Sequence, residues 1–305
     1  MRIVIVGSGA LGLFYGGLLQ RGGNDVHFLL RSDYDAIMQK GLTVHSIDGD
    51  YYLPHVQGHK NTAEIGPVDL VLVGLKTFAN RHLGELIWPL LSEDTQILTL
   101  QNGLGNEDYL ADLFGAERII GGVAFLCSNR GEPGHINHTA AGRIIIGEHQ
   151  VIDQSRLDLL AGCFRSAGID CKTTGDLKRA RWEKLVWNIP YNGLCALLQQ
   201  SVDLLMQTQA TRHLVRDLMV EVIAAANAQD LTKVITEGYA DSMLEFTDGM
   251  GIYKPSMQID REEGRELEIQ AIFRIPLEYG LKRNIKMPQV EMLATLLEQC
   301  GVSDS

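Results

Sequence analysis

The sequence IVIVGSGALG, residues 3–12, decides the fold predicted for the first half of the chain. Its first four residues are β-branched and apolar, which is typical of a buried parallel strand. The remaining six form the pattern G-x-G-x-x-G, and helical character follows to about Gln20. Each glycine has a steric role: Gly7 permits a tight turn, Gly9 lets a pyrophosphate approach the backbone, and Gly12 lets the helix pack against the strand.

The glycine loop lies in a complete βαβ unit, because a second strand is expected over Asp25–Leu30 after the helix ends at Gly22-Gly23. A helix N-terminus offers free N–H groups and a partial positive charge to phosphate groups. The sequence therefore predicts that a dinucleotide binds to the whole loop, which consists of Gly7, Ser8, Gly9, Ala10, Leu11 and Gly12.

The residues after the second strand indicate which dinucleotide is bound. In sites for NAD, a carboxylate at this position holds the ribose 2′-hydroxyl. Here the strand is followed by Arg31 and Ser32, and a guanidinium beside a hydroxyl suits a 2′-phosphate. The predicted cofactor is NADP(H). In the alternative interpretation, Arg31 is a solvated surface residue and Asp33 faces the ribose.

Strands continue to alternate with helices, which is typical of a mostly parallel sheet. Asp48-Gly49 predicts a hairpin turn in an alternating segment, and Pro133-Gly134 predicts another turn. Further strands are expected over residues 68–73, 96–100, 119–126 and 143–146, and a helix over Arg81–Leu91.

Near residue 176 helical spacing replaces the strand pattern. The predicted fold class is α/β: a Rossmann-type, doubly wound, mostly parallel sheet over residues 1–175, and an all-helical C-terminal domain over residues 176–305. The active site is expected in the cleft between these domains. The expected helices of the second domain include Leu185–Leu198, Leu204–Ala228 and Glu266–Tyr279.

Composition argues against several function classes. A formal net charge of −11 over 305 residues makes nucleic acid or an anionic membrane surface a poor partner. The five cysteines form no CxxC pair, so neither a zinc site nor a disulfide framework is expected. The pair His135 and His138 is interpreted as part of a surface turn. The N-terminal apolar run is too short for a spanning helix or a secretion signal. We therefore expect a cytoplasmic protein without a metal, whose partner is a small molecule; a homodimer is left open.

Two polar residues follow predicted strands at the edge where open α/β sheets bind ligands. Lys76 comes just after the strand over residues 68–73, and Asn102 follows the strand over residues 96–100. Both are placed to reach a bound cofactor, although Lys76 by itself would equally suit an ordinary loop.

The segment RWEKLVWNIPYN, residues 181–192, carries three polar residues on one face of a predicted helix. Lys184, Asn188 and Asn192 are spaced at i, i+4 and i+8. One interpretation is a hydrogen-bond network at a domain interface, and the other is a proton donor with two amide contacts to a substrate. Pro190 predicts a kink in this helix.

Six motifs follow one another in a fixed order along the chain. They are GSGALG, Arg31, LVGLK ending at Lys76, QNGLGN around Asn102, WEKLVWNIPYN around Lys184, and KPSMQIDREEGRELEI around Ser256 and Glu268. In this order they resemble the ketopantoate reductase family over nearly the whole length of the chain. The resemblance implies NADPH-dependent reduction of 2-dehydropantoate (ketopantoate) to pantoate, a reaction of pantothenate biosynthesis.

The resemblance also implies three catalytic residues. Lys184 would be the general acid, because hydride transfer to the keto carbon leaves negative charge on oxygen, which an ammonium can stabilise and protonate. Asn102 would contact both the nicotinamide end of the cofactor and the substrate. Glu268 would contact the substrate hydroxyl or the cofactor.

The remaining matching residues would bind ligands. By the same resemblance, Lys76 would orient the cofactor and the catalytic groups, and backbone near Cys127 would line the nicotinamide site. Asn188, Asn192 and Ser256 would hold the substrate.

Two features depart from the family pattern. A further substrate-facing asparagine of some relatives, downstream of Asn192, has no match near Val202. After Glu268 many relatives carry an acid and then Asn-Gly, whereas this chain has IQAIFR, residues 269–274. These departures leave the hydride-transfer residues unchanged and concern the substrate, so the nearest alternative is the same chemistry on another 2-oxo acid. A competitor from a different class is a non-catalytic NADP-binding sensor. Lys184 argues against the sensor, which needs no proton donor.

Overall fold

The computed structural model describes residues 1–152 and 154–300, and the chain forms two compact units. The sheet unit consists of Met1–Gln101 and Asn106–Leu177, and the helical unit consists of Asn102–Gly105 and the chain from Lys178 onward. The division lies close to residue 175, and the short loop Asn102–Gly105 belongs to the helical unit although the strand before it does not.

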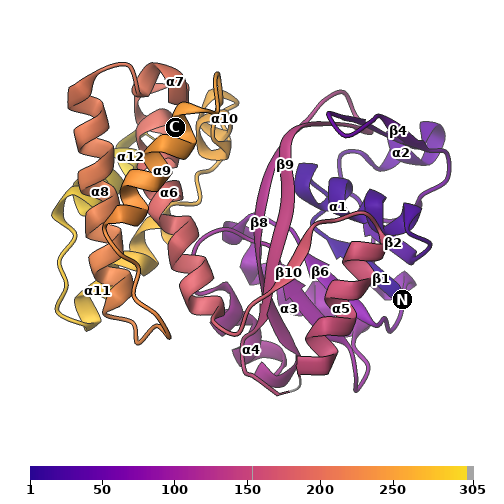
Figure 1. Ribbon diagram of the computed structural model, residues 1–305. Helices are drawn as coiled ribbons and strands as arrows, with labels where there is room; N and C mark the ends of the chain where they lie inside the picture. The colour runs from indigo at the N-terminus through magenta and orange to yellow at the C-terminus, as the bar shows by residue number, and fades with distance from the viewer. Residues whose placement is uncertain (153, 301–305) are drawn as a thin grey trace. The chain divides into compact units, whose positions relative to one another are not determined.

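The sheet unit is built on a ten-stranded sheet with the strand order β4-β3-β9-β8-β7-β6-β1-β2-β5 and with β10 beside β9 (Figure 1). Antiparallel pairing occurs between β3 and β4 and between β8 and β9, and the other pairs are parallel. The predicted mostly parallel sheet is confirmed. The strands are β1 (Arg2–Val6), β2 (Asp25–Leu29), β3 (Leu42–Ser46), β4 (Tyr51–Leu53), β5 (Gln57–His59), β6 (Leu70–Val73), β7 (Gln96–Thr99), β8 (Ile119–Arg130), β9 (His135–Glu148) and β10 (Cys171–Thr173).

The helices of the sheet unit are α1 (Ala10–Arg21), α2 (Tyr34–Lys40), α3 (Leu83–Ile87), α4 (Asn106–Phe114) and α5 (Gln154–Ser166). Short 3-10 turns lie at Thr62–Glu64, Thr77–His82, Trp88–Leu90 and Ala116–Arg118.

Helices cover both faces of the sheet, as the burial of β1 shows. Ile3 and Ile5 belong to one core, which includes side chains of α1 and α5. Val4 and Val6 belong to another core, which includes side chains of α3 and α4. Because successive side chains of a strand point to opposite faces, a continuous apolar run such as IVIV needs cover on both sides.

The helix predicted over Arg81–Leu91 is wrong in its extent. Only α3 is α-helical, and 3-10 turns adjoin it on both sides. Pro89 lies in the second of these turns. Proline has no N–H and its ring clashes with the carbonyl of the preceding turn, so a regular helix cannot continue through it easily.

The antiparallel pair β8 and β9 is longer than predicted, and the surface turn predicted at His135 and His138 is wrong because both residues lie in β9. His138 is 2% exposed, and its Nδ1 lies 2.8 Å from the hydroxyl of Ser46 on β3. This partner is distant in the sequence and could not be inferred from local turn residues. Among the described residues, no group of three or more His, Cys, Asp or Glu is placed to hold a metal ion.

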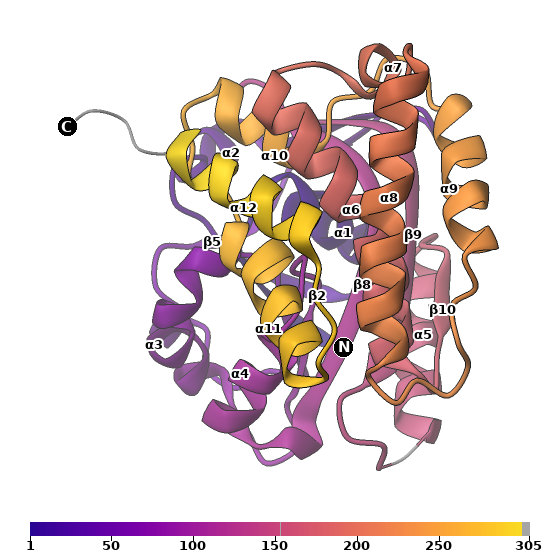
Figure 2. The ribbon, with the colours of Figure 1, turned by 90° about the vertical axis from the view of Figure 1, so that its left-hand side faces the viewer.

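Helices are the only regular secondary structure in the described part of the helical unit, which confirms the helical C-terminal part of the predicted fold class. Figure 2 shows α8 alongside α9 and α12, and α8 also packs against α11. None of the described helices is long and apolar enough to cross a membrane. The elements are α6 (Leu177–Leu198), α7 (Val202–Leu205), α8 (Gln209–Asn227), α9 (Gly238–Asp248), α10 (Ser256–Glu262), a π-helix (Gln270–Arg274), α11 (Ile275–Lys282) and α12 (Pro288–Cys300).

The single helix predicted over Leu204–Ala228 is wrong, because the chain forms α7 and then α8. Thr208 is the N-cap of α8, and its side chain accepts a hydrogen bond from the N–H of Thr211 at 3.1 Å. A threonine in this role satisfies a helix N-terminus and so favours a new start over continuation of the preceding helix.

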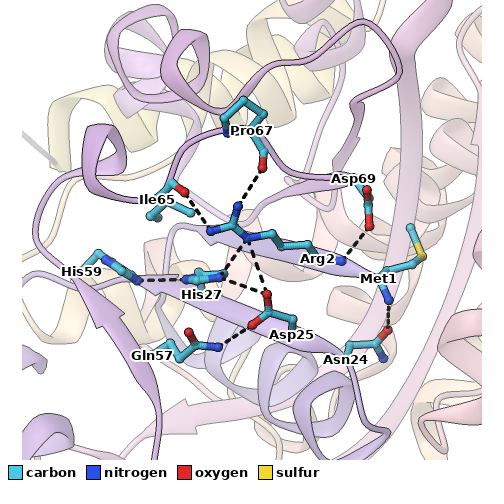
Figure 3. A network of polar contacts seen from close by, with 10 residues as sticks. All are labelled: Met1, Arg2, Asn24, Asp25, His27, Gln57, His59, Ile65, Pro67 and Asp69. Atoms are coloured by element: carbon cyan, nitrogen blue, oxygen red, sulfur yellow. Dashed lines mark hydrogen bonds and ion pairs between the residues drawn. The ribbon is translucent and has the colours of Figure 1, made fainter.

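A polar network at the start of β1 ties the N-terminus to the segment before β6 (Figure 3). The guanidinium of Arg2 donates to the carbonyl oxygens of Ile65 at 2.8 Å and Pro67 at 3.1 Å. The backbone N–H of Arg2 donates to the carboxylate of Asp69 at 2.7 Å. These bonds anchor Arg2, the first residue of β1.

The same network surrounds His27, which lies on β2 and is 5% exposed. Its Nε2 lies 3.3 Å from Arg2 Nε and 3.4 Å from Asp25 Oδ2, and its Nδ1 lies 3.0 Å from His59 Nε2. Burial lowers the pKa of His27; Asp25 opposes this shift and Arg2 adds to it. The fold therefore favours the neutral imidazole.

We expect His27 to make stability depend on pH. Its folded pKa lies below the ordinary value of 6.5, so the unfolded chain takes up a proton first as the pH falls. The stabilisation is complete above the unfolded pKa and is lost as the pH falls through the folded pKa. The free energy of unfolding of His27→Gln, measured by urea denaturation, should therefore fall less than that of the wild type upon acidification. His55→Gln, which replaces an exposed histidine, is the control; identical pH profiles for His27→Gln and the wild type would contradict the argument.

Candidate active site

The glycine loop between β1 and α1 is a tightly packed turn with one open position. Gly7 has φ +108°, which favours glycine. A Cβ at Gly12 would lie 2.2 Å from the carbonyl oxygen of Gly7, so no side chain fits where α1 meets β1. Gly9, the N-cap of α1, is different, because no neighbouring heavy atom lies within 4 Å of its Cβ position.

A dinucleotide pyrophosphate fits this arrangement. The first N–H groups of a helix have no partner within the helix, and those of α1 follow the open position at Gly9. The first turn of α1 contains no acidic residue that would repel a phosphate. Ser8, Ala10 and Leu11 are all partly exposed in the same loop.

The end of β2 carries Arg31 and Ser32, both exposed. Asp33, the residue that the alternative interpretation places at the ribose, is only 4% exposed. Its carboxylate forms an ion pair with Arg130, the last residue of β8. Sequence reasoning missed Arg130, because no local pattern links it to residues almost 100 positions earlier in the chain.

An amide network connects the ends of β6 and β7 next to Lys76, which is half-buried and begins a 3-10 turn. Gln101 Nε2 donates to the carbonyl oxygen of Leu75 at 3.0 Å and to Asn80 Oδ1 at 2.7 Å. Asn80 in turn donates to Asn106 Oδ1 at 3.1 Å. Sequence reasoning singled out the motif QNGLGN but not its first residue, Gln101, whose position at the end of a strand was the available signal.

Cys127 lies in an irregular part of β8. The register between β8 and β9 shifts between Phe125 and Leu126 and again between Cys127 and Ser128. The carbonyl of Cys127 accepts a hydrogen bond from the hydroxyl of Thr139 at 3.3 Å. Bulges of this kind change the direction of side chains and are frequent beside active sites.

The polar stripe predicted from the sequence lies on α6, which is one continuous α-helix through Pro190. Asn188 and Asn192 are 4% and 3% exposed, and Lys184 is half-buried. Gly193 allows close packing of α6, since a Cβ there would lie 2.5 Å from a methyl group of Leu293. The stripe therefore faces a mostly desolvated environment.

The two asparagines differ in their partners. Asn192 Oδ1 accepts a hydrogen bond from the backbone N–H of Met257 at 3.1 Å. Ser256, the first residue of α10, directly precedes Met257, so the structure brings Asn192 and Ser256 together. The side chain of Asn188 makes no hydrogen bond to the described residues. Both polar atoms of this amide remain accessible, so they can bond water or a ligand.

This difference predicts different effects on stability. Asn192→Ala should lower the free energy of unfolding by about 1–3 kcal/mol, because a buried backbone N–H loses its acceptor. Asn188→Ala removes the same side chain from the same helix and breaks no hydrogen bond, so its loss should be clearly smaller. Urea denaturation of both variants makes the comparison. Equal losses would show that Asn188 has a structural partner after all.

Glu268 is 4% exposed and lies just before the π-helix, where its carbonyl accepts a hydrogen bond from Ile272 N at 3.2 Å. The helix predicted over Glu266–Tyr279 is thus only partly correct, because residues 266–268 lie outside any helix and Gln270–Arg274 are π-helical. π-Helical turns are rare in proteins as a whole, and those that do occur often lie at functional sites.

The loop that carries Asn102 packs against this π-helix. Leu104 N donates to the carbonyl oxygen of Ala271 at 3.0 Å. Gly103 has φ +83°, and a Cβ there would lie 2.3 Å from the same carbonyl oxygen. The structure therefore places the segments of Asn102 and Glu268 side by side within the helical unit.

The fold and the glycine loop define a class: an enzyme fold with a Rossmann-type dinucleotide-binding unit and a helical unit that carries a lysine and amides. Within this class, the chain belongs to the ketopantoate reductase family. A family model described as "Ketopantoate reductase PanE/ApbA" matches residues 3–150, and one described as "Ketopantoate reductase PanE/ApbA C terminal" matches residues 176–300. The family resemblance inferred from the motifs is confirmed, and it implies a nicotinamide cofactor.

Individual relatives agree with this family. The 2-dehydropantoate 2-reductase of Nostoc sp. is 41% identical over 297 residues, which are 96% of this chain and 92% of that protein. The crystal structure of 2-dehydropantoate 2-reductase from Geobacter metallireducens GS-15 is 69% identical with a TM-score of 0.97, covering 98% of this chain and 99% of that one. A ternary structure of D-mandelate dehydrogenase with NADH and anilino(oxo)acetate shares the fold, with a TM-score of 0.91 at 22% identity over 99% of this chain and 98% of that one.

Proposed function

We propose that this protein is a 2-dehydropantoate 2-reductase, which reduces ketopantoate to pantoate with NADPH in pantothenate biosynthesis. The observation that carries the proposal is the 69% identity, over nearly the full length of both chains, to a solved 2-dehydropantoate 2-reductase. The accessible amide of Asn188, which has no hydrogen-bond partner among the described residues and lies four residues after Lys184 on α6, supports a ligand site at the predicted position.

In this proposal the sheet unit, like the predicted domain 1–175, binds the cofactor. The loop from Gly7 to Gly12 holds the pyrophosphate, and Arg31 with Ser32 holds the 2′-phosphate of NADP(H). Lys76 and the backbone near Cys127 adjoin the nicotinamide. The open position at Gly9 and the exposure of Arg31 support these roles. When bound, NADPH supplies the hydride for the reaction.

The helical unit, like the predicted domain 176–305, supplies the acid. Lys184 stabilises the negative charge that develops on the substrate's keto oxygen and donates a proton to it. Its half-buried position on α6, four residues before Asn188, reduces screening by water and so strengthens the electrostatic attraction.

The other polar residues of the helical unit position the substrate. Asn188, Asn192 and Ser256 offer hydrogen bonds to the carboxylate and hydroxyl groups of the 2-oxo acid. Asn102 and Glu268 hold the reacting end, and their segments are joined by the hydrogen bond between Leu104 and Ala271, which limits their relative movement. We place the enzyme in the cytoplasm, in keeping with its five free cysteines.

The test is the rate of NADPH oxidation with ketopantoate, compared with a panel of other 2-oxo acids and with NADH in place of NADPH. Efficient turnover of ketopantoate with NADPH is the expected result. Turnover of a different acid would support the reaction class but show that ketopantoate is not the substrate. Tight NADPH binding without turnover of any acid would favour the non-catalytic sensor.

A further inference from the structure

Arg130 connects two parts of the sheet unit that are far apart in the sequence. It is the last residue of β8, and its Nη2 donates to the hydroxyl of Ser32 at 2.9 Å, across 98 residues of sequence. The same nitrogen donates to Asp33 Oδ1. Its side chain is 45% exposed, whereas that of Asp33 is 6% exposed. The guanidinium therefore covers a buried carboxylate and remains accessible itself.

Among the described residues, the carboxylate of Asp33 contacts Arg130 and does not cap the helix that follows it. Asp33 is the N-cap of α2, where an aspartate usually accepts a hydrogen bond from the N–H of the second or third helical residue. Here the side chain makes no such bond. It is directed to Arg130 instead, although it stands two positions after Arg31, where a 2′-phosphate is expected. Without Arg130, this carboxylate would repel the phosphate dianion.

The positive groups around Ser32 exceed the negative one. Arg31 makes no side-chain hydrogen bond or ion pair with the described residues. Arg130 contacts Ser32 and Asp33 through Nη2, and its Nε and Nη1 have no partner among the described residues. Two guanidinium groups and one carboxylate leave one net positive charge and several free donors, which suits a phosphate and not a ribose hydroxyl.

We propose that Arg130 is a second 2′-phosphate residue, and that it favours NADP(H) over NAD(H) by neutralising Asp33 and by offering its remaining donors to the phosphate. The neutralised Asp33 cannot hold a ribose 2′-hydroxyl as a free carboxylate does in NAD sites. Arg130 then contributes its remaining donors to the 2′-phosphate beside Arg31. This inference rests on the proposed use of NADP(H).

The experiment measures binding of 2′,5′-ADP and of 5′-AMP by calorimetry, because the two ligands differ only in the 2′-phosphate. Arg130→Gln should weaken binding of 2′,5′-ADP by about tenfold or more, the loss of one charge-assisted hydrogen bond. Binding of 5′-AMP should change by less than about threefold. In kinetics, KM for NADPH should rise while KM for NADH stays nearly constant. Arg143→Gln, which replaces an exposed arginine of β9 that lies over Phe125, is the matched control.

Asp33→Asn tests the same idea without removing the arginine. It frees Arg130 and deletes a negative charge, so 2′,5′-ADP should bind at least as tightly as in the wild type. In the double variant with Arg130→Gln, part of the lost affinity should return, because the unpaired carboxylate is gone. Weaker 2′,5′-ADP binding in Asp33→Asn would overturn the proposal.

The outcomes separate this inference from the proposed function. A wild-type protein that binds both ligands equally would overturn the use of NADP(H), and this inference with it. A wild type that prefers 2′,5′-ADP, together with an Arg130→Gln variant that keeps this preference unchanged, would overturn only the role of Arg130. Equal weakening of both ligands would show a merely structural contact and would also overturn that role.

Discussion

Lys184→Ala is expected to lower turnover of ketopantoate by about 10²- to 10⁴-fold, the usual contribution of a general acid. NADPH binding should be nearly unchanged, because the residues proposed to bind the phosphates lie in the sheet unit and Lys184 lies on α6. Single-turnover absorbance measurements give the rate, and quenching of protein fluorescence gives the NADPH affinity. The loss should appear mainly in kcat, since the charge that Lys184 stabilises develops in the transition state.

Two further variants show what Lys184 does. Lys184→Arg keeps a positive charge, but a guanidinium does not release a proton at neutral pH. If proton donation matters, Lys184→Arg should stay far below the wild type; near-normal turnover would mean that charge alone suffices. Lys178→Ala removes another lysine of α6, whose ammonium contacts the carbonyl of Gln229 at 3.1 Å. It should retain turnover, and if Lys184→Ala does so too, the general-acid role is wrong.

Gly9→Val is expected to abolish dinucleotide binding while the protein stays folded. No neighbouring heavy atom lies within 4 Å of the Cβ position at Gly9, so a side chain fits the protein itself. It would occupy the space through which the pyrophosphate reaches the N–H groups of α1. Losing two charge-assisted hydrogen bonds, each worth about 1.5–3 kcal/mol, weakens binding about 100-fold or more. Calorimetric titration with NADPH and a thermal melt together test this expectation.

Gly12→Val, in contrast, should destabilise the fold itself. A Cβ at this position would lie 2.2 Å from the carbonyl oxygen of Gly7, which is backbone and cannot move aside cheaply. The expected result is a severe loss of stability, measured by the thermal melt, before any effect on binding can be judged.

Gly84→Val is the matched control for Gly9→Val, because this glycine of α3 also has open space around it but lies outside the glycine loop. If Gly9→Val binds NADPH normally, the loop does not hold the pyrophosphate.

The sequence was most informative where the signal is local. The run from Ile3 to Val6 predicted a strand buried on both faces, and the structure shows all four residues at 0% exposure. The glycine spacing predicted a turn that only glycine fits, as Gly7 and Gly12 show. Prediction was weaker where one element ends and the next begins. Thr208 starts a new helix where helical spacing alone suggested continuation, and the π-helix after Glu268 has the same apolar pattern as an α-helix.

The sequence by itself determined the Rossmann-type sheet, the helical second unit, the family, and the residues from which a site can be built. All of these depend on short-range periodicity or on motifs in a fixed order. Only the tertiary structure decided which of those residues already have partners. Asn188 and Asn192 are equivalent by spacing, yet only Asn192 accepts a hydrogen bond from Met257. Arg130 has no motif, yet it neutralises Asp33. The physical reason is that strand pairing and helix packing bring distant residues together, and a hydrogen bond depends on distance in space and not along the chain.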